Sequence, residues 1–152
     1  MAGMLNGAKA YQAQQRLDMN RLVESYAPLV KRIALHLKAR LPACVEVDDL
    51  IQSGMIGLMD AASHYEDGHG AVFETYASIR IRGAMIDELR QSDWAPRSVH
   101  QNTRSISDAI SRLSNKLGRD PRDFEIANEL GVDIDKYHQM LNDSSSSQMI
   151  GI

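Results

Sequence analysis

Residues 47–59 read VDDLIQSGMIGLM, and this stretch decides the fold class. Asp48 and Asp49 fall in what would be the first turn of a helix, where negative charge is favourable. The apolar residues that follow recur at three- and four-residue spacing, which is typical of a helix and not of a strand. They also occupy more than one side, so the stretch predicts a helix that is apolar around most of its circumference.

The flanking segments continue the helical pattern. Before the quoted stretch, apolar residues keep helical spacing over residues 22–41, and Pro28 within them predicts a kink or a restart. After it, residues 67–70 read DGHG and predict a turn. A third helix is predicted over residues 72–90, and the sequence WAP at 94–96 interrupts it.

A second helical unit is predicted after Pro96. It begins with one long apolar stripe, is broken by GRDP at residues 118–121, and continues with two shorter helices up to about residue 142. No segment alternates in the manner of a strand, so the predicted fold class is all-α. We expect two small helical domains with flexible ends: a loose N-terminal tail at 1–19, a first domain at 20–95, a three-helix, helix-turn-helix-like domain at 96–143, and the start of a linker at 144–152.

The charge is unevenly distributed. The chain has 17 basic and 20 acidic residues, a net charge of −3 that argues against nucleic-acid binding only if the charge is evenly spread. In the stretch 71–105 every base is an arginine, and arginine suits bidentate contacts to phosphate or guanine. Taken alone, five arginines are more typical of a solvated helix face.

The sequence excludes several function classes. The five histidines have no metal-ligand spacing, and no nucleophile elbow, P-loop or dinucleotide motif occurs, so we expect no catalytic residues, no metal and no cofactor. Cys44 is the single cysteine, which excludes an intrachain disulfide and suits a reducing, cytoplasmic setting. No apolar run approaches the roughly 18–20 residues that span a bilayer, so we expect no membrane partner.

The second unit carries a helix-turn-helix pattern around Ala127 and Gly131. Its second helix begins with two aspartates, which would face phosphates unfavourably, so we interpret the motif as architecture or as a protein-docking surface. The first helix of the unit is the better DNA-binding candidate. Arg97, Gln101 and Arg104 share one of its faces, beside His100, and Arg and Gln suit the edges of guanine and adenine.

Several motifs, in order along residues 20–142, together resemble one family. DLIQSGMIGLM at 49–59 and FETYA at 73–77 resemble segments of bacterial RNA polymerase sigma factors. GAMIDELR at 83–90, followed by DWAPRSV at 93–99, resembles the flagellar (motility) alternative type. The resemblance implies sigma domains 2 and 3, and a chain that lacks the domain reading the minus-thirty-five element.

The resemblance also implies site residues. Binding to the clamp helices of the largest subunit of core RNA polymerase is implied for the first helix quoted, at Asp49, Leu50, Gln52, Ser53 and Met55. A pocket for a flipped base of the minus-ten element of promoter DNA is implied at Tyr65, Glu66 and Tyr76. Ile79 and Arg80 occupy the positions where housekeeping sigma factors carry a tryptophan wedge.

The upstream edge of the minus-ten element is implied to face Gly83 and Ile86, neither of which can make bidentate hydrogen bonds. We therefore expect Asp87 and Arg90 to read a GC-containing upstream half, since Asp can accept from cytosine and Arg can donate to guanine. His100 matches the residue that touches the extended minus-ten duplex, which agrees with the face of Arg97, Gln101 and Arg104.

The sequence thus predicts a non-enzymatic initiation factor that binds core polymerase and helps recognise and open flagellar promoters. The resemblance also implies an anti-sigma factor as a partner. Two alternatives stay open: a stand-alone helix-turn-helix transcriptional regulator, and a protein-interaction module for which DNA binding is incidental.

Overall fold

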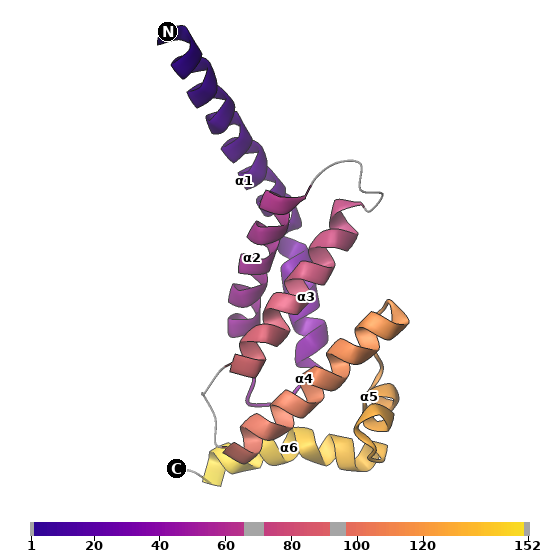
Figure 1. Ribbon diagram of the computed structural model, residues 1–152. Helices are drawn as coiled ribbons and strands as arrows, with labels where there is room; N and C mark the ends of the chain where they lie inside the picture. Colours follow the sequence, from indigo (N-terminus) through magenta and orange to yellow (C-terminus); the bar gives the residue numbers. More distant parts are fainter. Residues whose placement is uncertain (1, 66–71, 92–96, 151–152) are drawn as a thin grey trace.

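The structure is a computed structural model that describes residues 2–65, 72–91 and 97–150, and the side chains of residues 7–65, 72–91 and 101–142 (Figure 1). Every regular element in these ranges is a helix, which confirms the predicted all-α class. The helices, in chain order, are α1 (Ala2–Lys38), α2 (Val47–His64), α3 (Phe73–Gln91), α4 (Arg97–Leu117), α5 (Asp123–Leu130) and α6 (Ile134–Ile150).

The first three helices form one packed unit in which α2 contacts both α1 and α3 (Figure 1). The side of α2 that faces its neighbours carries Gly54 and Gly57, which let the helix backbones approach closely. A Cβ atom built at Gly57 would lie 2.7 Å from the carbonyl oxygen of Arg80 and 3.1 Å from the Cα of Ile81. The backbones of α2 and α3 therefore meet directly at this point.

The second unit consists of α4, α5 and α6. The predicted stripe of α4 is its buried face, with Thr103, Ile106 and Ile110 no more than 1% exposed. Gly131 ends α5 in a left-handed conformation at φ 74°, as the helix-turn-helix pattern requires. Tyr137 of α6 is fully buried beneath these helices.

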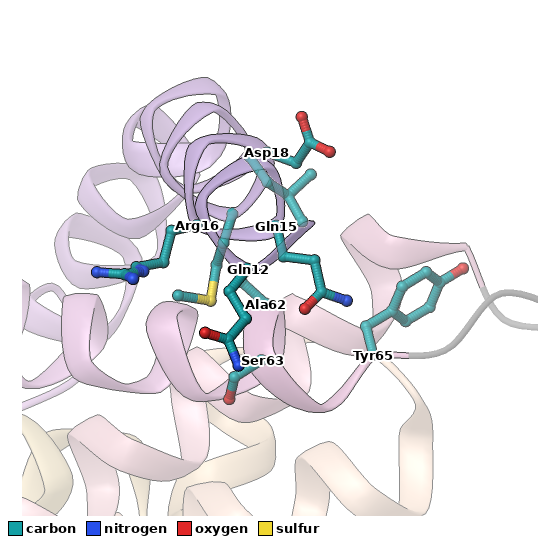
Figure 2. Close-up of a pocket in the computed structure, with 9 residues that line it drawn as sticks. Gln12, Gln15, Arg16, Asp18, Ala62, Ser63 and Tyr65 are labelled. Carbon is teal, nitrogen blue, oxygen red and sulfur yellow. The ribbon is translucent and has the colours of Figure 1, made fainter. Parts of the chain in front are cut away.

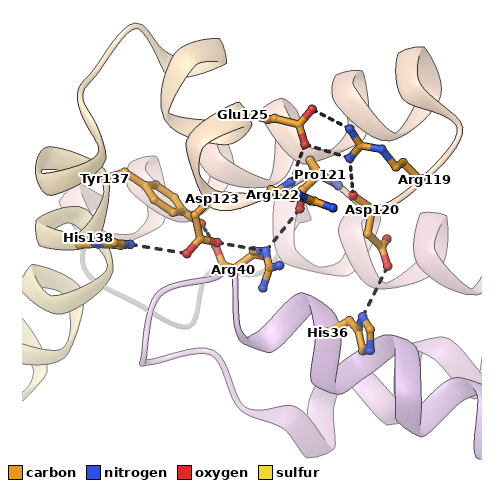
Figure 3. A network of polar contacts seen from close by, with 10 residues as sticks. All are labelled: His36, Arg40, Arg119, Asp120, Pro121, Arg122, Asp123, Glu125, Tyr137 and His138. Carbon is orange, nitrogen blue, oxygen red and sulfur yellow. Dashed lines mark hydrogen bonds and ion pairs between the residues drawn. The ribbon is translucent and has the colours of Figure 1, made fainter.

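A polar junction joins the second unit to the C-terminal end of α1 (Figure 3). The Tyr137 hydroxyl donates a 2.6 Å hydrogen bond to the carbonyl oxygen of Arg40, and the Arg40 guanidinium lies 3.1 Å from the Asp123 carboxylate. Burial, together with the nearby Asp123 charge, raises the pKa of Tyr137 well above its usual range. Asp120 adds contacts to His36 at 3.6 Å and to Arg82 at 2.6 Å.

Three expectations about the ends of the chain and about Pro28 differ from the structure. Residues 2–19 are helical and belong to α1, because the polar stretch around Gln12–Leu17 consists of good helix formers. Helix α1 continues through Pro28 without a restart. Residues 144–150 extend α6 instead of forming a linker, as adding residues to an existing helix costs far less than nucleating one.

We predict that Gly57→Ala destabilises the chain, because its Cβ would overlap the Arg80 carbonyl group. The expected loss is about 1–3 kcal/mol in the free energy of unfolding, measured by urea denaturation. The matched control is Gly83→Ala, also inside a helix but with nothing within 4 Å of its Cβ, which should stabilise by about 0.5–1 kcal/mol. Equal stability of the two variants would contradict the close approach of α2 and α3.

A second prediction concerns the junction with α1. Tyr137→Phe removes the hydroxyl that donates to the Arg40 carbonyl and leaves the buried ring in place, so we expect a loss of about 0.5–1.5 kcal/mol. Thermal unfolding followed by circular dichroism checks it, with Tyr11→Phe at an exposed site of α1 as control. No difference between the two variants would contradict a role for the hydroxyl in joining the units.

Candidate functional site

The outward face of α2 combines charge with large apolar side chains. Asp49 and Gln52 are exposed, and beside them Ile56 is 61% and Met59 47% exposed. Exposed apolar side chains that share a helix face with polar ones are characteristic of a protein contact surface. We call Asp49, Gln52, Ile56 and Met59 the α2 face.

The other residues implied for this surface differ in exposure. Ser53 and Met55 are half-buried at its edges. Leu50 is only 1% exposed and belongs to the hydrophobic core, so its implied contact with polymerase is wrong. It lies on the inner side of α2, where it packs the helix into the first unit and acts on the outer face only through that packing.

An aromatic cluster lies where the end of α2 meets the start of α3. Tyr65 has its ring centroid 5.2 Å from Phe73 and 5.6 Å from Tyr76, and Tyr26 lies 4.9 Å from Phe73. Tyr65 and Tyr76 are each half-buried, so part of each ring remains accessible. Such rings, fixed by their neighbours, suit stacking of an unpaired base.

Arg80 completes the cluster from the same helix as Tyr76. Its guanidinium carbon lies 5.4 Å from the centre of the Tyr76 ring, and it donates a 3.2 Å hydrogen bond to the Tyr76 hydroxyl. It also lies 3.2 Å from the carboxylate of Asp60 on α2. The structure therefore brings Tyr65, Tyr76 and Arg80 together, whereas Glu66, implied for the same pocket, lies outside the described residues.

Further along α3, the residues implied to face the minus-ten element differ in exposure. Ile79 is 62% exposed, and Gly83 and Asp87 are also exposed. Ile86 is only 6% exposed and belongs to the core cluster, so it does not present its side chain for reading a base pair. A cavity of about 700 Å³ separates this part of α3 from α4, with Ile79 and Gly83 among the residues that line it.

The N-terminal half of α4 lies beside the end of α3. Arg90 at the end of α3 is 3.2 Å from Asp108 of α4, one helical turn after Arg104. Gln101 and Arg104 are exposed, as their shared face predicted. Arg97 and His100 belong to α4 by their backbone, but their side chains lie outside the described residues.

Acids from other segments pair with the arginines of α3. Asp60 faces Arg80, Asp120 faces Arg82 and Asp108 faces Arg90. Sequence analysis missed these pairs, because each acid is distant in the chain from its arginine. Exposed ion pairs are worth about 0–1 kcal/mol, so a strongly charged ligand can displace the acids at Arg80 and Arg90.

Comparisons with known proteins assign the family. Residues 22–95 match the family model of Sigma-70 region 2, and residues 101–151 match that of Sigma-70 region 3. Together the two regions cover most of the chain, and their order is that of the two helical units. The chain therefore belongs to the sigma-70 family of RNA polymerase sigma factors.

Within this family the chain is similar to flagellar members. It is 53% identical over 145 residues to the RNA polymerase sigma factor FliA of Pseudomonas aeruginosa, 50% identical over 139 residues to that of Escherichia coli K12, and 37% identical over 131 residues to the sigma-D factor of Bacillus subtilis. The matches cover 95%, 91% and 86% of this chain, respectively, but only 59%, 58% and 52% of those relatives.

A solved structure is also similar to the chain. It is described as the cocrystal structure of the flagellar sigma/anti-sigma complex, Sigma-28/FlgM, and it matches with a TM-score of 0.51 and 37% identity. The match covers 86% of this chain and 57% of the solved one.

Among the described residues of this chain, no helix is long and apolar enough to cross a membrane.

Proposed function

We propose that the chain is the polymerase-binding and promoter-opening part of a flagellar-type sigma factor. The single observation that carries this proposal is the division of one rigid helix pair into two surfaces. The α2 face presents Asp49 and Gln52 beside two exposed apolar side chains, whereas α3 presents Tyr76 and Arg80 in a half-buried aromatic cluster. The first surface suits a protein and the second suits an unpaired base.

In this proposal the α2 face binds the clamp helices in the largest subunit of core RNA polymerase. Tyr65, Tyr76 and Arg80 then hold the flipped minus-ten base, with Ile79 next to it, and Gly83, Asp87 and Arg90 face the upstream half of the element. Arg97, His100, Gln101 and Arg104 contact the extended minus-ten duplex. Residues 20–95 thus form sigma domain 2, and residues 96–143 form sigma domain 3.

The factor works without catalysing a reaction, in the cytoplasm, where transcription occurs. Its binding energy stabilises an open promoter, and polymerase supplies the chemistry. An anti-sigma factor is a further partner in this proposal, supported by the relative that was crystallised as a flagellar sigma/anti-sigma complex.

The alternative of a stand-alone helix-turn-helix regulator has less support. The second helix of the motif begins with exposed Asp133 and Asp135, and the Asp133 carboxylate accepts a 2.7 Å hydrogen bond from the Lys136 backbone. Both acids would repel DNA phosphates. The Asp133 carboxylate serves to cap the helix. A protein-interaction module without DNA binding would leave the exposed side chains of α3 unexplained.

The experiment measures binding of the chain to core polymerase, and binding of the resulting complex to a fork-junction promoter DNA. Asp49→Ala should weaken polymerase binding about tenfold, as hot-spot residues do. Tyr76→Ala should leave polymerase binding intact and weaken fork binding roughly tenfold, by loss of a stacking ring. Asp135→Ala, an exposed first-turn acid on another helix, is the control for Asp49.

Two outcomes would contradict the proposal. Tight fork binding without polymerase would favour the stand-alone regulator. Polymerase binding without any gain in fork binding would favour the protein-interaction module.

Selection of promoter sequences from a random pool tests whether Asp87 and Arg90 read the upstream half of the minus-ten element. With wild-type chain and core polymerase, the selected minus-ten elements should contain G·C pairs in their upstream half, because Asp87 and Arg90 suit cytosine and guanine. Arg90→Ala should relax that preference, since one good bidentate contact discriminates by about 1–3 kcal/mol. Selection of an element made only of A·T pairs would show that these two residues do not read the sequence.

A further inference from the structure

The cavity of about 700 Å³ between α3 and α4 lies where the first helical unit meets the second. Its volume is within the range of roughly 300–1,000 Å³ that small-molecule sites occupy, and such sites often lie between domains. Val72, Ile79 and Arg82 line it from α3, and Ser114 and Asn115 line it from α4. The cavity thus combines apolar surface with hydrogen-bonding groups, as a ligand site does.

Two buried polar atoms of this cavity, the Nε of Arg82 and the hydroxyl oxygen of Ser114, have no hydrogen-bond partner in the part of the chain that the structure describes. A buried polar group is costly to leave unsatisfied, so a ligand that supplies acceptors is favoured here. The pocket that Figure 2 shows beside Tyr65 has no such atom among its lining residues. Unmet hydrogen-bonding capacity therefore distinguishes the cavity between α3 and α4.

The charges around the cavity are balanced by three ion pairs, which join Arg32 to Glu74, Arg82 to Asp120 and Arg119 to Glu125. A ligand of low charge suits such surroundings better than one that carries several phosphates. Asp120 lies 2.6 Å from the Nη2 of Arg82, and the Nε–H of the same guanidinium is left for another acceptor. A single phosphate group, bound by this N–H and by the Ser114 hydroxyl, meets both conditions.

The remaining lining residues suit a nucleobase. Val72 is 66% and Ile79 62% exposed, so a base has two apolar side chains to lie against. The amide of Asn115 offers a donor and an acceptor side by side, which matches the edge of adenine. One phosphate site, apolar contacts and an amide are together the groups that bind a nucleoside monophosphate.

We propose that the cavity between α3 and α4 binds a free nucleoside monophosphate, with its phosphate on Arg82 and Ser114 and its base beside Ile79 and Asn115. Ile79 and Gly83 line the cavity and are also proposed to face the minus-ten element, so the nucleotide and the promoter exclude each other. This competition rests on the proposed function, whereas nucleotide binding itself does not. The site makes promoter binding responsive to a small molecule.

Isothermal titration calorimetry of the chain with AMP tests binding without polymerase or DNA. The double variant Ser114→Ala with Asn115→Ala should bind AMP about tenfold more weakly than the wild type, because hydrogen bonds to the phosphate and to the base are lost. Inorganic phosphate should bind more weakly than AMP, since it lacks the base.

The matched control is the double variant Ser105→Ala with Asn128→Ala, which makes the same two changes at exposed helical sites outside the cavity. It should bind AMP as the wild type does. Alanine is the best helix former, so neither double variant should unfold the chain. No AMP binding by the wild type, equal AMP affinity of the two double variants, or phosphate binding as tight as AMP binding overturns the inference.

A second measurement tests competition with the promoter, in complexes of the chain with core polymerase and fork-junction DNA. AMP at ten times its measured Kd should weaken fork binding by the wild-type complex about tenfold. It should not weaken fork binding by the complex with Ser114→Ala and Asn115→Ala. Both complexes contain the same polymerase, so any binding of AMP to polymerase cancels in this comparison.

The outcomes of this second measurement are distinguishable. An equal effect of AMP on both complexes, or no effect on either, shows that the nucleotide and the promoter do not compete and overturns that part of the inference. Weaker fork binding by the double variant in the absence of AMP would assign the cavity to a phosphate of promoter DNA instead. Failure of the wild-type complex to bind the fork contradicts the proposed function and leaves the calorimetric result standing.

Discussion

The direct contact between the backbones of α2 and α3 is the constraint on which the rest of the structure depends. Gly57 leaves no room for a Cβ atom against the Arg80 carbonyl group, so the two helices are held in one register. That register sets Arg80 beside Asp60, and it places Tyr65 against Phe73 and Tyr76. It also turns the α2 face outward, so one packing contact orients both proposed binding surfaces.

Charge pairing within the chain reconciles the proposed DNA-binding role with a net charge of −3. Arg80, Arg82 and Arg90 each have an acid within 3.2 Å, supplied by α2, by α4 or by the segment between α4 and α5. In the proposed function, the exposed pairs of Arg80 and Arg90 reduce attraction to DNA in the free chain, and phosphates replace their acids when polymerase holds the promoter nearby. The arrangement fits a factor that binds DNA firmly only as part of a larger complex.

The sequence predicted those features that depend on local pattern. The helices, the buried stripe of α4 and the left-handed Gly131 follow from spacing and from the conformational freedom of glycine. It missed features that depend on tertiary contacts. The burial of Leu50 and the pairing of Arg90 with Asp108 depend on which neighbour covers each side of a helix, and the helical start of α1 has no apolar stripe to reveal it.

The central claim is that one rigid helix pair binds polymerase on one face and single-stranded DNA on the other. Site-specific photo-crosslinking in a complex of the chain, core polymerase and fork-junction DNA tests it most directly. A photoreactive side chain at exposed Ile56 should crosslink to the largest polymerase subunit, and one at exposed Ile79 should crosslink to the non-template strand. Crosslinking of position 56 to DNA, or of position 79 to polymerase alone, would contradict the account.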